Sequence, residues 1–358
     1  MSNELMILFG AGAAYDCADL SKSSVNIDYR PPLTHQIFSR QIISEAGLSK
    51  VVLNQFKNKI LNEHFLASSV GHEFNNSETL EDYLARLKSS ILDSDRRKYF
   101  AVCAYLKELF VEISKNYLSA PLDNNYHSLL CKLVRTDYTK FNFVTTNYDT
   151  IFDNTVEKLF NVRFKSSNDY LNFSGDGKNF SYIKAHGSVN WNFILNQQCD
   201  QLNNLHNVRN GTIEVNDNIM RFVDNANNIY VGNSLEYGVV KFPAMAVPLG
   251  TYKFVNQNQI NSFKNQNINF RHLLIIGYSG KDNTIFELLK SLIKEPINIF
   301  IIDKDRESVV NVFRLFKSNL SNMVRVTSES INYFPGGFTN FINEHCDSWI
   351  DRISGNPH

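Results

Sequence analysis

The chain has 358 residues, of which 43% are hydrophobic, 20% charged and 13% aromatic, which is typical of a globular protein. This composition excludes a wholly disordered, collagen-like or coiled-coil chain. Lys and Arg total 36, as do Asp and Glu, so the formal net charge is zero and no overall basic field favours nucleic acid or an anionic membrane.

The cysteine pattern excludes a zinc knuckle, because no two of the five cysteines have C-x-x-C spacing. No apolar stretch reaches about 18 residues, the length needed for a membrane span. We therefore expect a cytoplasmic protein with no metal, no membrane contact and no direct nucleic-acid partner. The five cysteines are Cys17, Cys103, Cys131, Cys199 and Cys346.

The chain begins with a continuous apolar run, Leu5–Phe9, that ends in Gly10-Ala-Gly12. This pattern predicts a buried parallel strand that enters a tight turn, followed by a helix over about residues 13–20. From Leu33 to about Leu118 the apolar residues recur at three- and four-residue spacing, which predicts a helical subdomain over residues 33–120. Within it, Thr79 and Asp82 resemble a capping box.

Strand patterns return at residues 141–145 and 181–185, and a helix pattern begins at Ile151. Residues 190–267 are rich in Asn and Gln, which predicts an irregular insertion or small lobe containing a strand over 228–232.

Two further strands are predicted over residues 272–276 and 297–302, with a helix over 283–294 between them. Strand, glycine turn and helix in repetition predict an α/β fold, a doubly wound Rossmann-like parallel sheet. We expect one domain over residues 1–345 and a C-terminal tail over 346–358.

Polar motifs follow four of the predicted strands, at the edge where ligands bind in doubly wound sheets. Gly10-Ala-Gly12 suits a close approach of backbone N–H groups to phosphate, although it would equally serve as a structural turn. Tyr15 stands where the dinucleotide fingerprint G-x-G-x-x-G requires its third glycine, which disfavours a dehydrogenase-type site. Asn147 could contact a ribose or only cap the next helix, and His186 could be a base or only a turn residue.

These motifs resemble, in kind and order, the NAD-binding and catalytic motifs of the sirtuin superfamily. The closer resemblance is to the sirtuin-like domains of bacterial anti-phage defence systems. The motifs are Gly10-Ala-Gly12, Thr146-Asn-Tyr-Asp149, His186-Gly187 and Gly277-Tyr-Ser279, with the longer phrases Pro31–Thr34, Ile183–Trp191 and Gly277–Asp282.

The resemblance implies a role for each matching position. Asn147 would hold the nicotinamide ribose and the attacking water, and His186 would be the base that acts on a ribose hydroxyl. The other implied NAD contacts are Gly10, Ala11, Gly12 and Ala13 around the phosphates, Thr146 and Asp149 on the nicotinamide side, and Gly277, Ser279 and Asp303 on the adenosine side.

The implied activity is that of an NAD+ glycohydrolase (NADase), which releases nicotinamide and ADP-ribose as the effector of anti-phage defence by NAD+ depletion. Deacylase sirtuins carry two C-x-x-C pairs, which this chain lacks. A sirtuin-type protein deacylase or ADP-ribosyltransferase remains one alternative. A non-catalytic sensor of NAD or ADP-ribose, or an assembly module, is another. We expect a homo-oligomer formed through the helical subdomain, with a possible partner such as a HerA-type ATPase.

Overall fold

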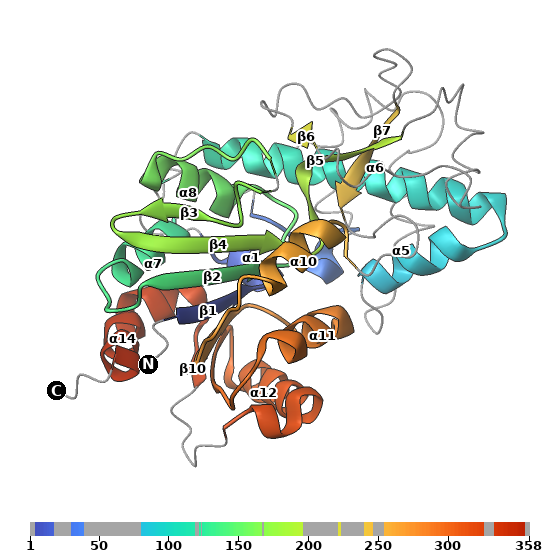
Figure 1. The fold of residues 1–358 in the computed structure, drawn as a ribbon. Coiled ribbons are helices and arrows are strands. Elements are labelled where there is room, and N and C mark those ends of the chain that lie inside the picture. The colour runs from blue at the N-terminus through green and yellow to red at the C-terminus, as the bar shows by residue number, and fades with distance from the viewer. Residues whose placement is uncertain are drawn as a thin grey trace.

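A seven-stranded sheet forms the centre of the computed structural model, with strand order β10-β9-β8-β1-β2-β4-β3 (Figure 1). Neighbouring strands are parallel except β3, which is antiparallel to β4. The strands are β1 (Glu4–Phe9), β2 (Lys140–Thr145), β3 (Phe173–Gly175), β4 (Lys178–Lys184), β8 (His272–Ile276), β9 (Asn298–Asp303) and β10 (Tyr333–Pro335). The structure describes residues 4–17, 30–38, 80–118, 122, 124–166, 168–195, 221–222, 240–245, 254–325 and 333–354.

Both faces of this sheet are buried, as the continuous apolar runs predict. In β1, Leu5, Ile7 and Phe9 pack into one hydrophobic cluster, whereas Met6 and Leu8 pack into the other. Helices cover both faces, which confirms the predicted doubly wound α/β fold. One cluster includes α6 (Asp93–Leu118), α7 (Asn125–Leu133), α8 (Ile151–Phe160) and α14 (Cys346–Ser354), and the other α10 (Gln257–Lys264), α11 (Asn283–Leu292) and α12 (Arg306–Leu320).

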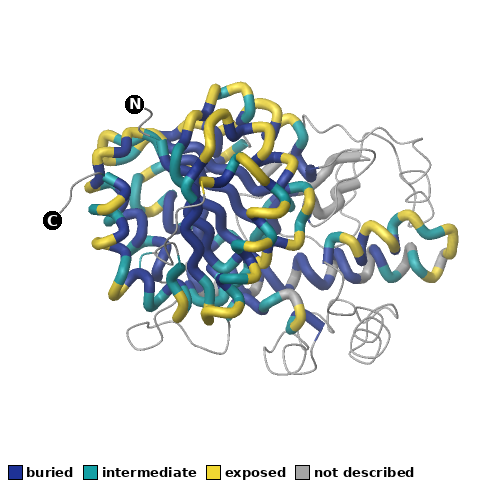
Figure 2. Tube along the Cα trace, turned by 90° about the horizontal axis from the view of Figure 1, so that it is seen from below, coloured by how far each residue is buried: buried dark blue, intermediate teal, exposed yellow. Residues whose placement is uncertain are grey.

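The predicted helical subdomain is helical over residues 80–118, where α5 (Leu80–Ser89) packs against α6. Figure 2 shows this pair of helices extending from the body of the molecule, with exposed residues at its far end. Thr34–Gln36 forms a single 3₁₀ turn, and the expected capping box at Thr79 lies outside the described residues.

Two predicted segments before the C-terminus differ from the structure. The first helix, α1, covers Ala11–Tyr15, because it begins directly after the tight turn at Gly10, and residues 18–20 of the predicted helix lie outside the described residues. The predicted irregular insertion contains a second, three-stranded antiparallel sheet, with order β6-β5-β7. Its strands are β5 (Gly187–Leu195), β6 (Arg221–Phe222) and β7 (Val240–Met245), and the predicted strand 228–232 lies outside the described residues.

The predicted C-terminal tail contains α14, which is part of the core. Cys346, Trp349 and Ile353 recur at three- and four-residue spacing on one face of this helix, and all three are buried.

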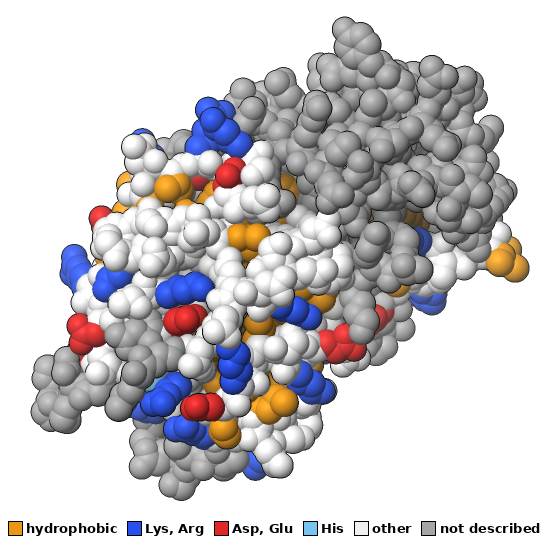
Figure 3. Space-filling view, in the orientation of Figure 1, with side chains coloured by type: hydrophobic (Ala, Val, Ile, Leu, Met, Phe, Trp, Pro, Cys, Tyr) orange, Lys and Arg blue, Asp and Glu red, His pale blue; other side chains and the backbone are white. Residues whose placement is uncertain are grey.

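On the face shown in Figure 3, Lys and Arg side chains are interspersed with Asp and Glu. The visible surface therefore presents no field of a single sign, in line with the balanced composition. None of the described helices combines the length and the hydropathy needed to cross a membrane.

Candidate functional site

The polar motifs meet at the carboxyl edge of the parallel sheet, around a cavity of about 660 Å³. Strand order reverses at β1, which lies between β2 and β8, and doubly wound sheets bind ligands at this switch point. The predicted site residues that line the cavity are Ala11, Gly12, Thr146, Asn147, Asp149, His186, Gly277, Ser279 and Asp303. The other two predicted residues, Gly10 and Ala13, are buried and do not line it.

The glycines at the switch point allow two loops to approach each other closely. A Cβ atom at Gly10 would lie 2.5 Å from the carbonyl oxygen of Gly277, and one at Gly12 would lie 2.8 Å from the Gly277 Cα. Gly277 itself has φ +58°, a conformation that favours glycine. Packing between loops is thus sufficient to require glycine at all three positions.

Backbone hydrogen bonds also engage three of the four amides that were expected at the NAD phosphates. The Gly10 amide donates to Ile276 (3.0 Å), the Gly12 amide to Gly277 (2.9 Å) and the Ala13 amide to Gly10 (3.0 Å). In this arrangement these amides hold the turn together, which supports its structural interpretation.

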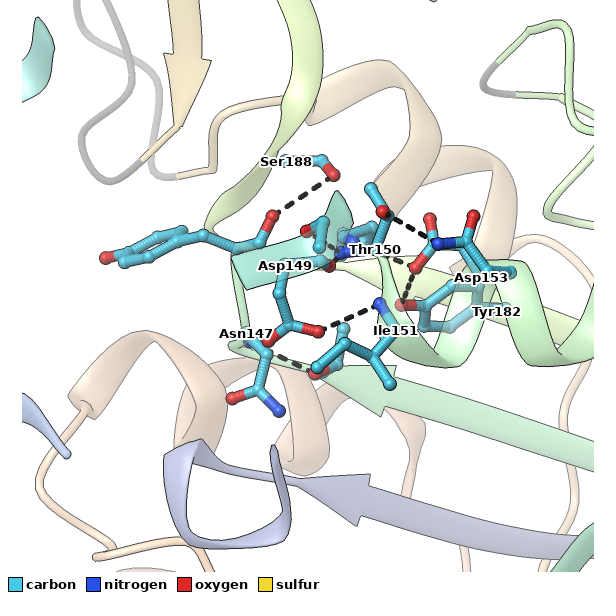
Figure 4. Close-up of polar contacts among 12 residues, drawn as sticks. Asn147, Asp149, Thr150, Ile151, Asp153, Tyr182 and Ser188 are labelled. Atoms are coloured by element: carbon cyan, nitrogen blue, oxygen red, sulfur yellow. Dashed lines mark hydrogen bonds and ion pairs between the residues drawn. The ribbon is translucent and has the colours of Figure 1, made fainter. Parts of the chain in front are cut away.

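Asn147 is half-buried in the loop that follows β2 and lines the cavity. Its backbone N–H donates to Thr145 Oγ1 (3.0 Å), and its carboxamide has a long contact of 3.5 Å with the Tyr126 hydroxyl. The N-cap of α8 is Thr150, and the Ile151 amide donates to Asp149 Oδ1 (3.0 Å). In Figure 4 the Asn147 carboxamide points away from this capping bond. The alternative that Asn147 serves only as the helix cap is therefore wrong.

Asp149 presents a buried carboxylate to the cavity. Its exposure is 4%, and Oδ2 has no hydrogen-bond partner among the described residues. Burial raises the pKa of Asp149, although the nearby Lys184 ammonium opposes this effect. A buried acceptor without a partner is costly, so this oxygen suits an N–H donor from a ligand.

Lys184, at the end of β4, binds the loop that contains Asp149. Its Nζ donates to the Asp149 carbonyl oxygen (2.6 Å) and forms a buried ion pair with Asp153 Oδ2 on α8 (3.0 Å). The hydroxyls of Tyr170 and Tyr182 donate to the two Asp153 oxygens, at 2.7 and 3.1 Å. Because all these groups are buried, the network fixes the position of the Asp149 backbone relative to the sheet.

We expect Lys184→Met to lower the free energy of unfolding by about 3–5 kcal/mol, because it leaves the Asp153 carboxylate buried without its counter-charge. Urea denaturation measures this loss. The double variant Lys184→Met with Asp153→Asn should recover part of it, because no uncompensated charge remains. A single variant as stable as the wild type would show that the ion pair does not hold the loop.

His186 follows β4 and lies between two carboxylates. Its Nε2 is 2.7 Å from Asp282 Oδ2, and its Nδ1 is 3.0 Å from Glu81 Oε1. Tyr148 donates its hydroxyl to the same Glu81 oxygen. Burial would lower the pKa of His186, but the two carboxylates outweigh burial and raise it to about 10. In this arrangement His186 is protonated at neutral pH, unlike the expected histidine of ordinary pKa.

Sequence reasoning missed Glu81, Asp282 and Lys184 as members of the site. Asp282 and Lys184 stand inside the phrases Gly277–Asp282 and Ile183–Trp191, where a charged residue beside a strand end was an available indication. Glu81 is one of two acidic residues in the first turn of α5. Acidic residues are common at this position of a helix, so the sequence offered no reason to assign Glu81 to the site.

The part of the cavity where adenosine is predicted to bind is bounded by β9 and the loop after β8. Asp303 ends β9, and its Oδ1 accepts a hydrogen bond from the Lys304 amide (2.7 Å). Burial raises the pKa of Asp303. Ser279 is exposed, and Lys281 and Lys304 also line the cavity. An acid at a strand end next to cationic side chains suits a ribose diol beside phosphates.

Residues 142–315 match the family model described as the SIR2-like domain. No curated protein sequence matches the chain significantly.

Similar solved structures have low sequence identity. A Sir2 homologue in complex with NAD is 12% identical, with a TM-score of 0.45, and the alignment covers 99% of this chain and 90% of that chain. A mutant Sir2 homologue in complex with 2′-O-acetyl ADP ribose is 12% identical, with a TM-score of 0.44 and coverage of 99% and 93%. Sir2Tm bound to a propionylated peptide is 11% identical, with a TM-score of 0.38 and coverage of 99% and 95%.

Proposed function

We propose that this chain, which carries a SIR2-like domain, is an NAD+ glycohydrolase that releases nicotinamide and ADP-ribose. The observation that carries the proposal is the convergence of Asn147, Asp149, His186 and Asp303 on one cavity at the carboxyl edge of the sheet. These residues come from three different strand ends, and packing of the fold gives no reason for all of them to face one cavity.

The cavity supplies groups that fit the parts of NAD. The unpartnered Asp149 Oδ2 suits the N–H of the nicotinamide carboxamide. Lys281 and Lys304 provide positive charge for the pyrophosphate, and Asp303 can accept hydrogen bonds from the adenine ribose.

The reaction requires little acid catalysis. The bond between the ribose C1′ and the nicotinamide nitrogen breaks, and its electron pair leaves with the ring, which departs as neutral nicotinamide. Water adds to C1′ and loses a proton, so NAD+ and water give ADP-ribose, nicotinamide and H+. The Asn147 carboxamide would orient the ribose and the water, and His186 would accept a proton from a ribose hydroxyl.

Free nicotinamide, measured during incubation with NAD+ in the presence and absence of an acyl-lysine peptide, tests this function. Release without the peptide supports the hydrolase. Release that depends strictly on the peptide would support a deacylase. NAD binding without release in either case would favour the sensor.

A structural zinc would also favour the deacylase. The four described cysteines, Cys17, Cys103, Cys131 and Cys346, are free, and no three metal-ligating side chains converge within the described part of the chain. Cys199 lies outside the described residues. We expect elemental analysis of protein purified without chelator to find well below one zinc per chain, and activity to survive EDTA. Stoichiometric zinc would contradict this prediction.

We extend the proposal to a role as a cytoplasmic effector of anti-phage defence that depletes NAD+. The resemblance of Ile183–Trp191 and Gly277–Asp282 to phrases of defence-associated sirtuin-like domains supports this role. Such an enzyme needs control, for which we propose homo-oligomer contacts through the helical subdomain or a partner such as a HerA-type ATPase. Light scattering of the protein, alone and with the candidate partner, measures both assemblies.

A further inference from the structure

Each ring nitrogen of His186 lies within 3.0 Å of a carboxylate oxygen in this structure. A base must reach the hydroxyl proton that it accepts, at about 2.6–3.2 Å between heavy atoms. Asp282 lies within this distance of Nε2, and Glu81 lies within it of Nδ1. If His186 is the base of the proposed hydrolase, one of the two carboxylates has to leave before the reaction can start.

We propose that Glu81 is a positioning residue that restrains His186 in a resting state, and that Nδ1 becomes available to the substrate ribose only when Glu81 withdraws. This inference rests on the proposed function and concerns the control of its site.

The two carboxylates differ in how firmly they are held. Asp282 is the N-cap of α11, where its Oδ1 accepts from the Thr284 amide (2.7 Å) while its Oδ2 contacts His186. The helix that it caps is anchored in the core by side chains that are fully buried, among them Ile285 and Leu288. Withdrawal of Asp282 would therefore break the N-cap hydrogen bond of α11 as well as the ion pair with His186.

Glu81 is held less firmly. It lies in the first turn of α5, which packs against α6, and its side chain is 28% exposed, compared with 16% for Asp282. Its contact with His186 Nδ1 is an ion pair at 3.0 Å that is poorly aligned for a hydrogen bond. Glu81 also lines the cavity, so its carboxylate can turn away from His186 without leaving the site.

The charges around His186 favour the restrained state. The groups that face or influence the ring are Glu81 from α5, Tyr148 from the loop after β2, and Asp282 with its neighbour Tyr278 from the segment between β8 and α11. Burial alone would raise the pKa of Glu81, but the contact with charged His186 and the hydrogen bond from the Tyr148 hydroxyl lower it. Each partner thus stabilises the charged form of the other, and neutral His186 requires loss of this contact.

This arrangement links the helical subdomain to the proposed catalytic base. Glu81 is part of α5, so a displacement of α5 would remove the carboxylate from Nδ1 and lower the pKa of His186. The subdomain could in this way control activity through one ion pair.

The test uses Glu81→Gln, which removes the charge and keeps an oxygen for the Tyr148 hydroxyl, and Glu81→Ala, which removes the contact. Asp82→Asn is the matched control, because Asp82 is in the same helical turn, is exposed and does not line the cavity. NMR titration of the His186 ring gives its pKa without dependence on activity, and thermal unfolding checks the fold. Nicotinamide release gives kcat.

We expect both Glu81 variants to lower the pKa of His186 by about 1 or more, and Asp82→Asn to leave it unchanged. We expect kcat at pH 7 to rise about 5-fold or more in both variants, because a larger fraction of His186 is then neutral and accessible. The rise of kcat with pH should begin at lower pH than in the wild type.

An unchanged His186 pKa in both Glu81 variants would overturn the proposed contact. A lowered pKa with a decreased kcat would overturn the restraining role, because Glu81 would then assist catalysis. A lowered pKa without nicotinamide release in any protein would support the contact and count against the proposed hydrolase, so the two failures can be told apart.

Discussion

Replacement of Asn147 by alanine is expected to reduce kcat for NAD+ cleavage by about 10²-fold or more, the size of the effect of losing one preorganised polar contact to a transition state. Asn147 lines the cavity and does not cap α8, which is consistent with the proposed role toward NAD+. Nicotinamide release measures the loss. Asn154→Ala is the matched control, because the Asn154 carboxamide donates to Oγ1 of Thr150, the N-cap of α8, and Asn154 does not line the cavity.

The Asn147 variant should also fold normally. Its side chain has one long contact of 3.5 Å with Tyr126 among the described residues, so we expect the free energy of unfolding to fall by less than about 1 kcal/mol. Activity within a few-fold of the wild type would contradict the assignment of Asn147 to the reaction.

His186→Ala should cause a comparable loss of kcat while NAD affinity is largely retained, because a base acts mainly in the transition state. Single-turnover kinetics and calorimetric NAD binding separate the two effects. His345→Ala is a suitable control, because the His345 side chain is 39% exposed and does not line the cavity. Loss of binding together with turnover would make His186 a binding or structural residue.

The His186 variant has a second expected effect, on stability. The pKa of His186 is raised from 6.5 to about 10 in the folded protein, so its ion pairs contribute fully below about pH 6.5 and lose their contribution as the pH rises through 10. The destabilisation caused by His186→Ala should therefore be largest below pH 6.5 and decrease toward pH 10. Urea denaturation across this range measures it, and a pH-independent difference would contradict the charged pairing.

The parallel sheet could be predicted because the burial of its strands is evident from short apolar runs in the sequence. Leu5–Phe9 and residues 273–276 are apolar throughout, which is typical of a strand covered on both faces, and both runs end in glycine turns. The rule that ligands bind at the carboxyl edge then placed Asn147, His186 and Asp303 together before the fold was known.

The ion pairs of the site could not be predicted, because they depend on tertiary packing. Glu81 reaches His186 from a helix 105 positions earlier in the chain, and no spacing rule links the two. The close packing of Gly10 against Gly277 also joins residues that are far apart in the sequence, so it could not be predicted either. The second sheet was missed because Asn190 and Asn192 interrupt the apolar residues of β5, β7 contains Pro243, and β6 has only two residues.

Incorporation of oxygen from labelled water shows whether this cavity hydrolyses NAD+. We would incubate the wild type and Glu81→Gln with NAD+ in H₂¹⁸O and follow nicotinamide and ADP-ribose by mass spectrometry. The predicted result is release of both products in equal amounts, with one ¹⁸O on the ADP-ribose and a faster reaction in the variant. NAD binding by both proteins without release of nicotinamide would contradict the claim.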